Sequence, residues 1–485
     1  MKIIIIGAGI GGLATYHAFR KYLPFATIQI YDAHPSPLQP LSDDKYNSKL
    51  QVIGGGISLG PNGQRAMAAF APAALTYIRD RAFEYSAVKF VNQYGKVLGE
   101  FPFGSKERYG YGQLMATRAM VHEGFLVGED REVDGNVNWS SNVLRVWEET
   151  DNEGCVCVEF VDGTVERCDL LIGADGARSQ TRNALYGEEY KPYYDGLTGF
   201  GGFIPLSSFT PFTRDALIKT PKPTIAMSRI GGFGFSLLAP LNSPDTQKKL
   251  IWFSHVEIKN PLPRDTPRFD MMPLLLDRHG SWKSIYDDPG DECKTLFRQI
   301  ITVACGSKED NNWLMLPRFY TPLLPYWTSV SGLSGSRAKH GCGRIILVGD
   351  SAHAMPPEGA QGVSCAVEDC LTLALLLKHF LNKLHSETGV DILKADIPQE
   401  VMKHAILRSA EAYEAIRIPR VNKILTQAKG KADRKKQIGW VQDKIREIAV
   451  WVMSYLPESF LHDEIFGYDV KVHVANYLDV SEDSL

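Results

Sequence analysis

Residues 1–23 read MKIIIIGAGIGGLATYHAFRKYL, and this opening predicts a strand, a tight turn and a helix. The apolar run from Lys2 to Ile6 is typical of a strand buried on both faces, and the pattern after it is helical. Between them, Gly7, Gly9 and Gly12 form a G-x-G-x-x-G turn. Such a turn lets the backbone approach a pyrophosphate at the helix N-terminus. The stretch therefore predicts a dinucleotide-binding unit.

An acidic residue follows where such a unit needs one. A second strand is predicted from Ala26 to Tyr31, and Asp32 comes directly after it, twenty residues beyond Gly12. A carboxylate at this place can accept hydrogen bonds from an adenosine ribose. The alternative, a glycine turn with a structural role alone, is disfavoured by the order of strand, helix, strand and acid.

Composition narrows the class of protein. The chain has 485 residues, of which 44% are hydrophobic and 22% are charged, as in ordinary globular proteins with two or three layers or domains. A net charge of -3 gives no electrostatic case for nucleic acid, which requires a concentrated basic surface. The one basic run, KGKADRKK at residues 429–436, is interpreted as a solvated helix face.

The cysteines and apolar runs indicate the environment. Eight cysteines are scattered without a C-x-x-C pair, so neither a metal site nor a disulfide framework is predicted. This pattern fits a reducing compartment, and we expect a cytoplasmic protein. No apolar run approaches the ~20 residues of a membrane-spanning helix, and the N-terminal run is too short for a secretory signal.

A second informative stretch, residues 343–369, reads GRIILVGDSAHAMPPEGAQGVSCAVED. A buried strand is predicted from Ile345 to Val348, and Asp350 follows its carboxyl end, where ligands bind in open α/β sheets. Gly362 and Val363 then begin a helix, whose free N–H groups and dipole favour negative charge on a ligand.

The chain resembles the FAD-dependent class A monooxygenases of the para-hydroxybenzoate hydroxylase type, and within them the fungal members of secondary metabolism. The resemblance rests on the N-terminal turn, on GGGISLGPNGQRAM at residues 54–67, on DLLIGADGARSQTR at 169–182 and on the stretch at 343–369. These blocks stand in the family's order. Two positions depart from the family pattern, which has a glycine at Ala360 and an asparagine at Ser364; both lie in the loop expected to seat the flavin ring.

The resemblance implies noncovalently bound FAD, with Asp350 on the ribityl chain and Gly362 and Val363 at the N1 and O2 edge of the flavin. It also implies that Asp175 helps to hold FAD and that Arg118 contacts the flavin. The full predicted FAD set is Gly7, Gly9, Gly12, Asp32, Gly56, Arg118, Asp175, Asp350, Gly362 and Val363. Arg178 or Arg182 either meets the nicotinamide cofactor or forms a surface ion pair.

The predicted fold class is α/β. A Rossmann-like FAD-binding domain (residues 1–75, 100–190 and 335–385) is interleaved with a mostly antiparallel-sheet substrate domain (76–99 and 191–334). A C-terminal helical region covers residues 386–485. Aromatic strand residues such as Phe203, Phe235 and Trp252 either line the substrate pocket or form ordinary core, and core is favoured.

The resemblance implies an enzyme that uses NADPH or NADH and O2, acting through a flavin C4a-hydroperoxide. It would hydroxylate or epoxidise an electron-rich hydrophobic ring, such as an aromatic, indole, quinone or polyketide-like compound. No catalytic residue can be picked from the sequence: His353 is interpreted as stabilising its loop, and Gly201 falls where some fungal relatives have an arginine. The alternatives are a flavin oxidase or dehydrogenase that takes electrons directly from its substrate, and a noncatalytic FAD-fold protein. The oligomeric state is unknown.

Two helices are predicted near the C-terminus, Glu411 to Leu425 and Trp440 to Leu456. We expect both to pack over the FAD-binding domain. For the second, contact with a membrane surface is the alternative, because its Trp, Val, Met and Leu residues share a face.

Overall fold

The computed structural model describes residues 1–37, 55–127, 132–149, 154–187, 189–263, 266–290, 295–306, 313–330, 342–388, 397–433 and 437–482. Most of the block at 54–67 lies within these ranges, but Gly54 does not. Of the basic run at 429–436, residues 434–436 lie outside the described residues.

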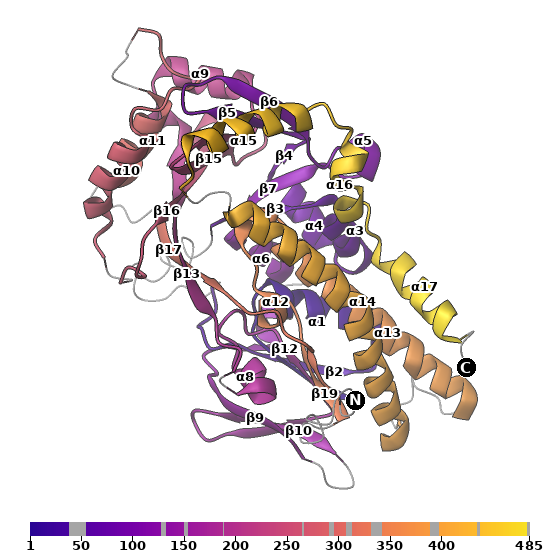
Figure 1. The fold of residues 1–485 in the computed structure, drawn as a ribbon. Coiled ribbons are helices and arrows are strands. Elements are labelled where there is room, and N and C mark those ends of the chain that lie inside the picture. The colour runs from indigo at the N-terminus through magenta and orange to yellow at the C-terminus, as the bar shows by residue number, and fades with distance from the viewer. Residues whose placement is uncertain are drawn as a thin grey trace.

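A six-stranded sheet forms the base of the FAD-binding half. Its order is β18 (Thr328–Val330), β19 (Cys342–Leu347), β12 (Leu170–Gly173), β1 (Lys2–Ile6), β2 (Thr27–Tyr31) and β8 (Val137–Asn138). β1 pairs in parallel with β2 and with β12, and β12 pairs in parallel with β19. The predicted strands therefore exist, and segments far apart in the sequence meet at one sheet (Figure 1). Because the strands are parallel, their carboxyl ends lie along the same edge.

Helices cover this sheet and form one large apolar core with it. α1 (Ile10–Tyr22) contacts α13 (Gly362–Thr388), and α13 contacts α3 (Pro61–Phe70) and α14 (Gln399–Asp433). The other helices around it are α4 (Pro72–Arg79), α5 (Lys106–Tyr109), α6 (Arg118–Val127), α7 (Glu132–Gly135), α8 (Gln180–Tyr186) and α12 (Asp350–His353).

Two three-stranded sheets flank the larger one. The first has the order β3 (Gly56–Leu59), β7 (Gln113–Thr117) and β4 (Phe83–Tyr85). The second has the order β11 (Val165–Cys168), β10 (Cys155–Phe160) and β9 (Val143–Glu149).

A seven-stranded sheet forms the other half of the molecule. Its order is β17 (Trp313–Tyr320), β13 (Tyr193–Pro205), β16 (Lys249–Glu257), β15 (Gly231–Leu237), β14 (Thr224–Ser228), β5 (Ala87–Asn92) and β6 (Val97–Pro102). All pairings are antiparallel except that of β14 with β5. Its associated helices include α9 (Pro211–Lys219), α10 (Met272–His279) and α11 (Leu296–Cys305).

This sheet has a second apolar core, separate from the first. The rings of Phe233 and Trp252 stack at 5.5 Å, and Phe297 of α11 meets Phe233 edge to face. Phe235 belongs to the same cluster. Phe235 and Trp252 are therefore core residues. β18, at residues 328–330, belongs to the six-stranded sheet although it precedes residue 335.

The C-terminal helices divide between the two halves. α14 contacts α13 and β19, as expected for residues 411–425. α15 (Trp440–Met453) contacts β6, so the prediction that it packs over the FAD-binding domain is wrong. α16 (Glu458–Phe466) and α17 (Val470–Glu482) lead the chain back to α3 and α13 (Figure 1). Among the described residues, no helix combines the length and apolar character needed to cross a membrane.

Candidate functional site

The glycine turn between β1 and α1 has no room for side chains at two of its glycines. Gly7 adopts a φ of +100°, and a Cβ there would lie 2.4 Å from the carbonyl oxygen of Ala174. A Cβ on Gly12 would lie 1.8 Å from the carbonyl oxygen of Gly7. A Cβ on Gly9 would meet only Nη2 of Arg118, at 3.8 Å. The turn is therefore open on the Gly9 side, where Arg118 supplies positive charge.

Asp32 lies against this turn. Its Oδ2 accepts a hydrogen bond from the backbone N–H of Ala8 at 2.7 Å, and its Oδ1 accepts one from that of His34 at 2.8 Å. Its side chain is 15% exposed, so an edge of the carboxylate remains accessible. His122 of α6 lies on the other side of the turn, with Nε2 2.7 Å from the carbonyl oxygen of Ala8. Burial lowers the pKa of His122, which keeps the ring neutral.

Asp350 stands at the carboxyl end of β19, as predicted. Its side chain is exposed and makes no hydrogen bond to the described residues. Gly349 before it adopts a φ of +59°, and its N–H donates to Oδ2 of Asp369 at 3.0 Å. The backbone is thus held from inside while the Asp350 carboxylate is free to accept hydrogen bonds from outside.

The start of α13 presents backbone donors at the same sheet edge. Gly362 and Val363 are half-buried, and neither N–H group has an acceptor among the described residues. The first N–H groups of a helix attract negative charge. Ala360 precedes them with a φ of +51°, a left-handed conformation that favours glycine. The alanine found where the family has glycine therefore strains the backbone.

A buried ionic network anchors this loop from behind. Glu368 and Asp369 of α13 face Arg417 and Arg420 of α14, and all four side chains are at most 9% exposed. Arg417 Nε donates to Oδ1 of Asp369 at 2.8 Å, and Arg420 Nε donates to Oε2 of Glu368 at 2.8 Å. His353 Nε2 lies 2.6 Å from Oδ2 of Asp369. The interpretation of His353 as a loop-stabilising imidazole is therefore confirmed.

These residues fit FAD. The open glycine turn beside Arg118 suits a pyrophosphate, and the accessible edge of Asp32 suits a ribose. The unpaired carboxylate of Asp350 suits the ribityl hydroxyls, and the free N–H groups of Gly362 and Val363 suit the electron-rich edge of a flavin.

Similarity to known proteins also indicates that the chain binds FAD. The family described as FAD binding domain matches residues 327–397. The chain is 26% identical over 443 residues to the FAD-dependent monooxygenase sor5 of Hypocrea jecorina, covering 89% of this chain and 86% of that one. It is 25% identical to the 6-methylsalicylate 1-monooxygenase atA of Aspergillus terreus, covering 88% and 82% of the two chains. This chain is an FAD-dependent monooxygenase, similar to the relatives named above.

Solved structures of other proteins have the same fold as this monooxygenase. Klebsiella pneumoniae HpxO complexed with FAD and uric acid has a TM-score of 0.67 and 19% identity, covering 99% of this chain and 97% of that one. CtdE in complex with FAD and a substrate has a TM-score of 0.71 and 17% identity, covering 99% and 98%. The overall fold of the two halves is therefore that of these two FAD-bound proteins.

In the monooxygenase, the Asp175 carboxylate accepts hydrogen bonds from the residues that follow it in the same turn. Its Oδ1 accepts from Oγ of Ser179 at 2.5 Å, and its Oδ2 accepts from the N–H of Thr181 at 3.0 Å. Burial raises the pKa of Asp175, and these hydrogen bonds oppose that rise. Arg182 is buried and donates to the carbonyl oxygens of Ala177 and Ser351, so its guanidinium ties the turn to α12. Arg178, in contrast, is exposed.

Gly56 marks the contact between the two halves of the monooxygenase. A Cβ there would lie 1.8 Å from Cδ1 of Ile251 in β16. At the other end of β3, the N–H of Gly60 donates to Oγ of Ser364 at 3.2 Å. β3 therefore connects the start of α13 with the seven-stranded sheet. Residues 38–54, just before it, lie outside the described ranges.

Sequence reasoning missed the role of Arg417 and Arg420. The signal was present as a paired Glu368-Asp369 in an otherwise apolar helix, because buried carboxylates need cationic partners. The partners lie 48 to 52 residues away in the sequence, and only the packing of α13 on α14 identifies them.

Proposed function

We propose that this monooxygenase uses NADPH or NADH and O2 to insert one oxygen atom into an electron-rich, hydrophobic ring, by hydroxylation or epoxidation. Aromatic, indole, quinone and polyketide-like compounds belong to this substrate class. One relative is named for 6-methylsalicylate and one solved structure holds uric acid; both are ring compounds and support the class.

The observation that carries the proposal is the bridge formed by β3. Gly60 contacts the start of α13, and Gly56 contacts β16 of the seven-stranded sheet. Four residues of extended strand cover about 13 Å. This separation accommodates a flavin ring and a second ring stacked between the helix start and the sheet.

The sheet face on this side lies outside the second apolar core and mixes glycines with the side chains of Phe203, Ile251 and Phe253. Core residues such as Trp252 point to the opposite face, toward α11. Strand alternation places Gly199 and Gly201 of β13, and Phe253 and His255 of β16, on the face that Ile251 shares. Glycines leave space for a planar ligand, and the Phe253 ring offers an apolar surface for it. We infer that the substrate ring binds here.

FAD, when bound, supplies electron transfer and the activation of O2. The chain holds it in place: Asp350 accepts hydrogen bonds, and the N–H groups of Gly362 and Val363 stabilise negative charge on the ring. The seven-stranded sheet positions the substrate and excludes water from the reacting atoms.

The test is stopped-flow absorbance of the purified holoenzyme under anaerobic conditions, mixed with NADPH or NADH. A panel of phenolic, indolic and quinone-like compounds is included in turn. We expect one compound class to accelerate flavin bleaching by the nicotinamide. Mixing with isotopically labelled O2 should then give a product that carries the label.

Two outcomes would overturn the proposal. Bleaching by a panel compound without a nicotinamide would make the enzyme an oxidase or dehydrogenase. Product oxygen that derives from water would exclude oxygen insertion from O2.

A further inference from the structure

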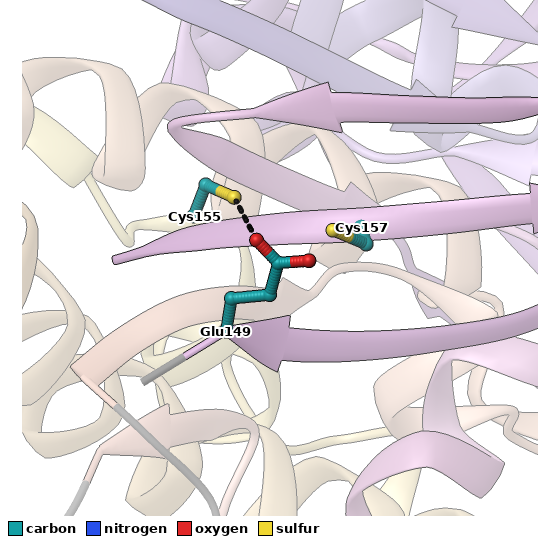
Figure 2. A group of neighbouring side chains, drawn as sticks. All are labelled: Glu149, Cys155 and Cys157. Atoms are coloured by element: carbon teal, nitrogen blue, oxygen red, sulfur yellow. Dashed lines mark hydrogen bonds between the residues drawn. The ribbon is translucent and has the colours of Figure 1, made fainter. Parts of the chain in front are cut away.

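A cluster of metal-ligating side chains lies outside the flavin site, on the hairpin of β9 and β10. Glu149 is the last residue of β9 and is paired across the hairpin with Cys155, the first residue of β10. Cys157 stands two residues further along β10, so its side chain points to the same face of the sheet. Figure 2 shows both sulfur atoms directed toward the carboxylate of Glu149.

The three ligand atoms are already close to the spacing of a bound ion. Cys155 Sγ lies 3.4 Å from Oε2 of Glu149, and ligand atoms of all three residues lie within 4.8 Å of one another. In a tetrahedral zinc site, bond lengths of about 2.3 Å to sulfur and 2.0–2.2 Å to oxygen place the ligand atoms about 3.5–3.8 Å apart. Small side-chain rotations are therefore enough to close the site around an ion.

The surroundings suit a partly shielded site. Cys157 is fully buried, whereas the Glu149 side chain is 28% exposed, so an ion can enter from the solvent side. Arg167 of β11 donates from Nη2 to Oε1 of Glu149 at 3.3 Å, and its side chain is 67% exposed. Two thiolates and one carboxylate around a divalent ion carry a net charge of about -1, which the Arg167 guanidinium neutralises.

We propose that Glu149, Cys155 and Cys157 bind a thiophilic divalent cation such as Zn²⁺, with a fourth coordination position open to water. Thiolate ligands select zinc-like ions over Mg²⁺ and Ca²⁺, which prefer oxygen ligands. The bound ion links the ends of β9 and β10. It lies on a different sheet from β1 and β19, so the proposal does not depend on the proposed function.

Binding has to displace protons. An ordinary cysteine thiol has a pKa of about 8.5 and is mostly protonated at neutral pH. Metal ligands must be deprotonated. We therefore expect about two protons to be released per ion, and an affinity that rises with pH.

The test titrates Cd²⁺ and Zn²⁺ into reduced, chelator-treated holoenzyme. Cd²⁺ binding is followed by thiolate-to-metal charge-transfer absorption, and Zn²⁺ binding by calorimetry in two buffers with different ionisation enthalpies, which gives the proton release. We expect a single ion per chain. Cys157→Ala should abolish the charge-transfer band, and Glu149→Gln should weaken binding about tenfold or more.

Matched controls separate ligand loss from general damage. Glu159 lies on β10, as do Cys155 and Cys157, but it pairs with Arg145 outside the cluster. The Glu159→Gln variant should therefore bind Cd²⁺ like the unaltered chain. Cys305→Ser, in α11, should retain the full absorption band. The proposal fails if the reduced chain shows no charge-transfer band, or if a folded Cys155→Ala/Cys157→Ala variant keeps it.

Discussion

Asp350 and Ala360 show what single residues contribute to the flavin site. Asp350 follows a buried strand, and its exposed carboxylate has no partner among the described residues. Ala360 holds a left-handed backbone conformation just before Gly362 and Val363, whose N–H groups we propose to face the flavin. We propose that both residues serve FAD binding, and two substitutions test this.

Asp350→Ala should weaken FAD retention. Hydrogen bonds to a charged group contribute about 1.5–3 kcal/mol, which corresponds to roughly 10–100-fold in the dissociation constant of FAD. Flavin fluorescence during dialysis measures the loss. Asp277→Ala, on the exposed side of α10, is the matched control and should retain FAD fully. Unchanged FAD occupancy in Asp350→Ala would remove this residue from the site.

Ala360→Gly should stabilise the protein. Glycine relieves a left-handed strain of about 1–2 kcal/mol, partly offset by its greater freedom in the unfolded chain. Chemical denaturation of the holoenzyme should therefore show a gain of about 1 kcal/mol. Ala449→Gly, at an exposed helical position of α15, should instead lose about 1 kcal/mol. A loss of stability in both variants would contradict strain at Ala360.

At the scale of elements, α13 and α14 are joined by charge as well as by apolar packing. Glu368 accepts from Arg420, contacts Nη1 of Arg417 at 2.8 Å and accepts from Nδ2 of Asn62 at 2.7 Å. Burial by itself would raise the pKa of Glu368, but Arg420 and Arg417 outweigh it and lower the pKa to about 2. The carboxylate is therefore ionised in the folded protein.

Glu368→Gln should destabilise the protein by about 3–5 kcal/mol at neutral pH, because it leaves two buried guanidinium groups underpaired. The pH dependence follows from the direction of the shift. The folded-state pKa of about 2 lies below the unfolded value of about 4.3, so Glu368 stabilises above about pH 4.3 and loses its contribution as the pH falls toward 2. Denaturation from pH 7 to 2 should show the variant and the unaltered chain converging. A constant difference would contradict ionisation of Glu368.

α15 is amphipathic, but its apolar face is exposed and its charged face packs against the protein. Trp440, Ile445, Ile448 and Trp451 are each more than half exposed, whereas Asp443 is 8% exposed. The charged residues turn toward the protein: Arg446 pairs with Asp443, and Lys444 pairs with Glu447 at 2.9 Å. Contact of this helix with a membrane surface stays a prediction.

In α15, replacing an apolar residue should therefore lower the free energy of unfolding less than replacing a charged residue. Ile448→Ala should change the free energy of unfolding by less than about 0.5 kcal/mol, because the side chain already lies in solvent. Asp443→Ala should cost about 1–2 kcal/mol, because Arg446 loses its buried partner. Urea denaturation of both variants makes the comparison. A larger loss for Ile448→Ala would show that its side chain is covered in solution.

At the scale of the whole molecule, the proposed substrate face arises because the chain interleaves its two halves. β3 and β7 lie between the six-stranded and the seven-stranded sheet (Figure 1). β5 and β6 precede β13 in the sequence but belong to the same seven-stranded sheet. The Phe253 ring lies over Gly234, where a Cβ would come within 2.1 Å of Cζ.

Gly234→Ala should displace the Phe253 ring and raise the KM for substrate while FAD stays bound. Gly232→Ala is the matched control on the same strand face, because a Cβ there meets only the carbonyl oxygen of Ala226 at 3.5 Å. Steady-state kinetics with the substrate found by stopped flow measures both. An equal KM in the two variants would place the substrate away from Phe253.

The local geometry of the candidate FAD site could be predicted from sequence. The glycine turn, Asp32 and Asp350 follow from strand and turn patterns, because each depends on residues adjacent in the chain. The position of α15 could not, because its apolar stripe has the spacing of a core-facing helix while its charged face is the one that packs on β6. Periodicity shows that a helix has two faces but not which face the protein covers.

The sequence alone was enough for the class of protein, the cofactor and the order of the blocks, because glycine turns and buried strands have local steric requirements. Tertiary structure was needed for everything that joins distant segments: Arg417 and Arg420 on the acids of α13, the contact of β3 with the seven-stranded sheet, and Glu149 facing Cys155 and Cys157. Charges and ligand atoms act over a few ångströms of space whatever their separation along the chain, and a single sequence does not contain those distances.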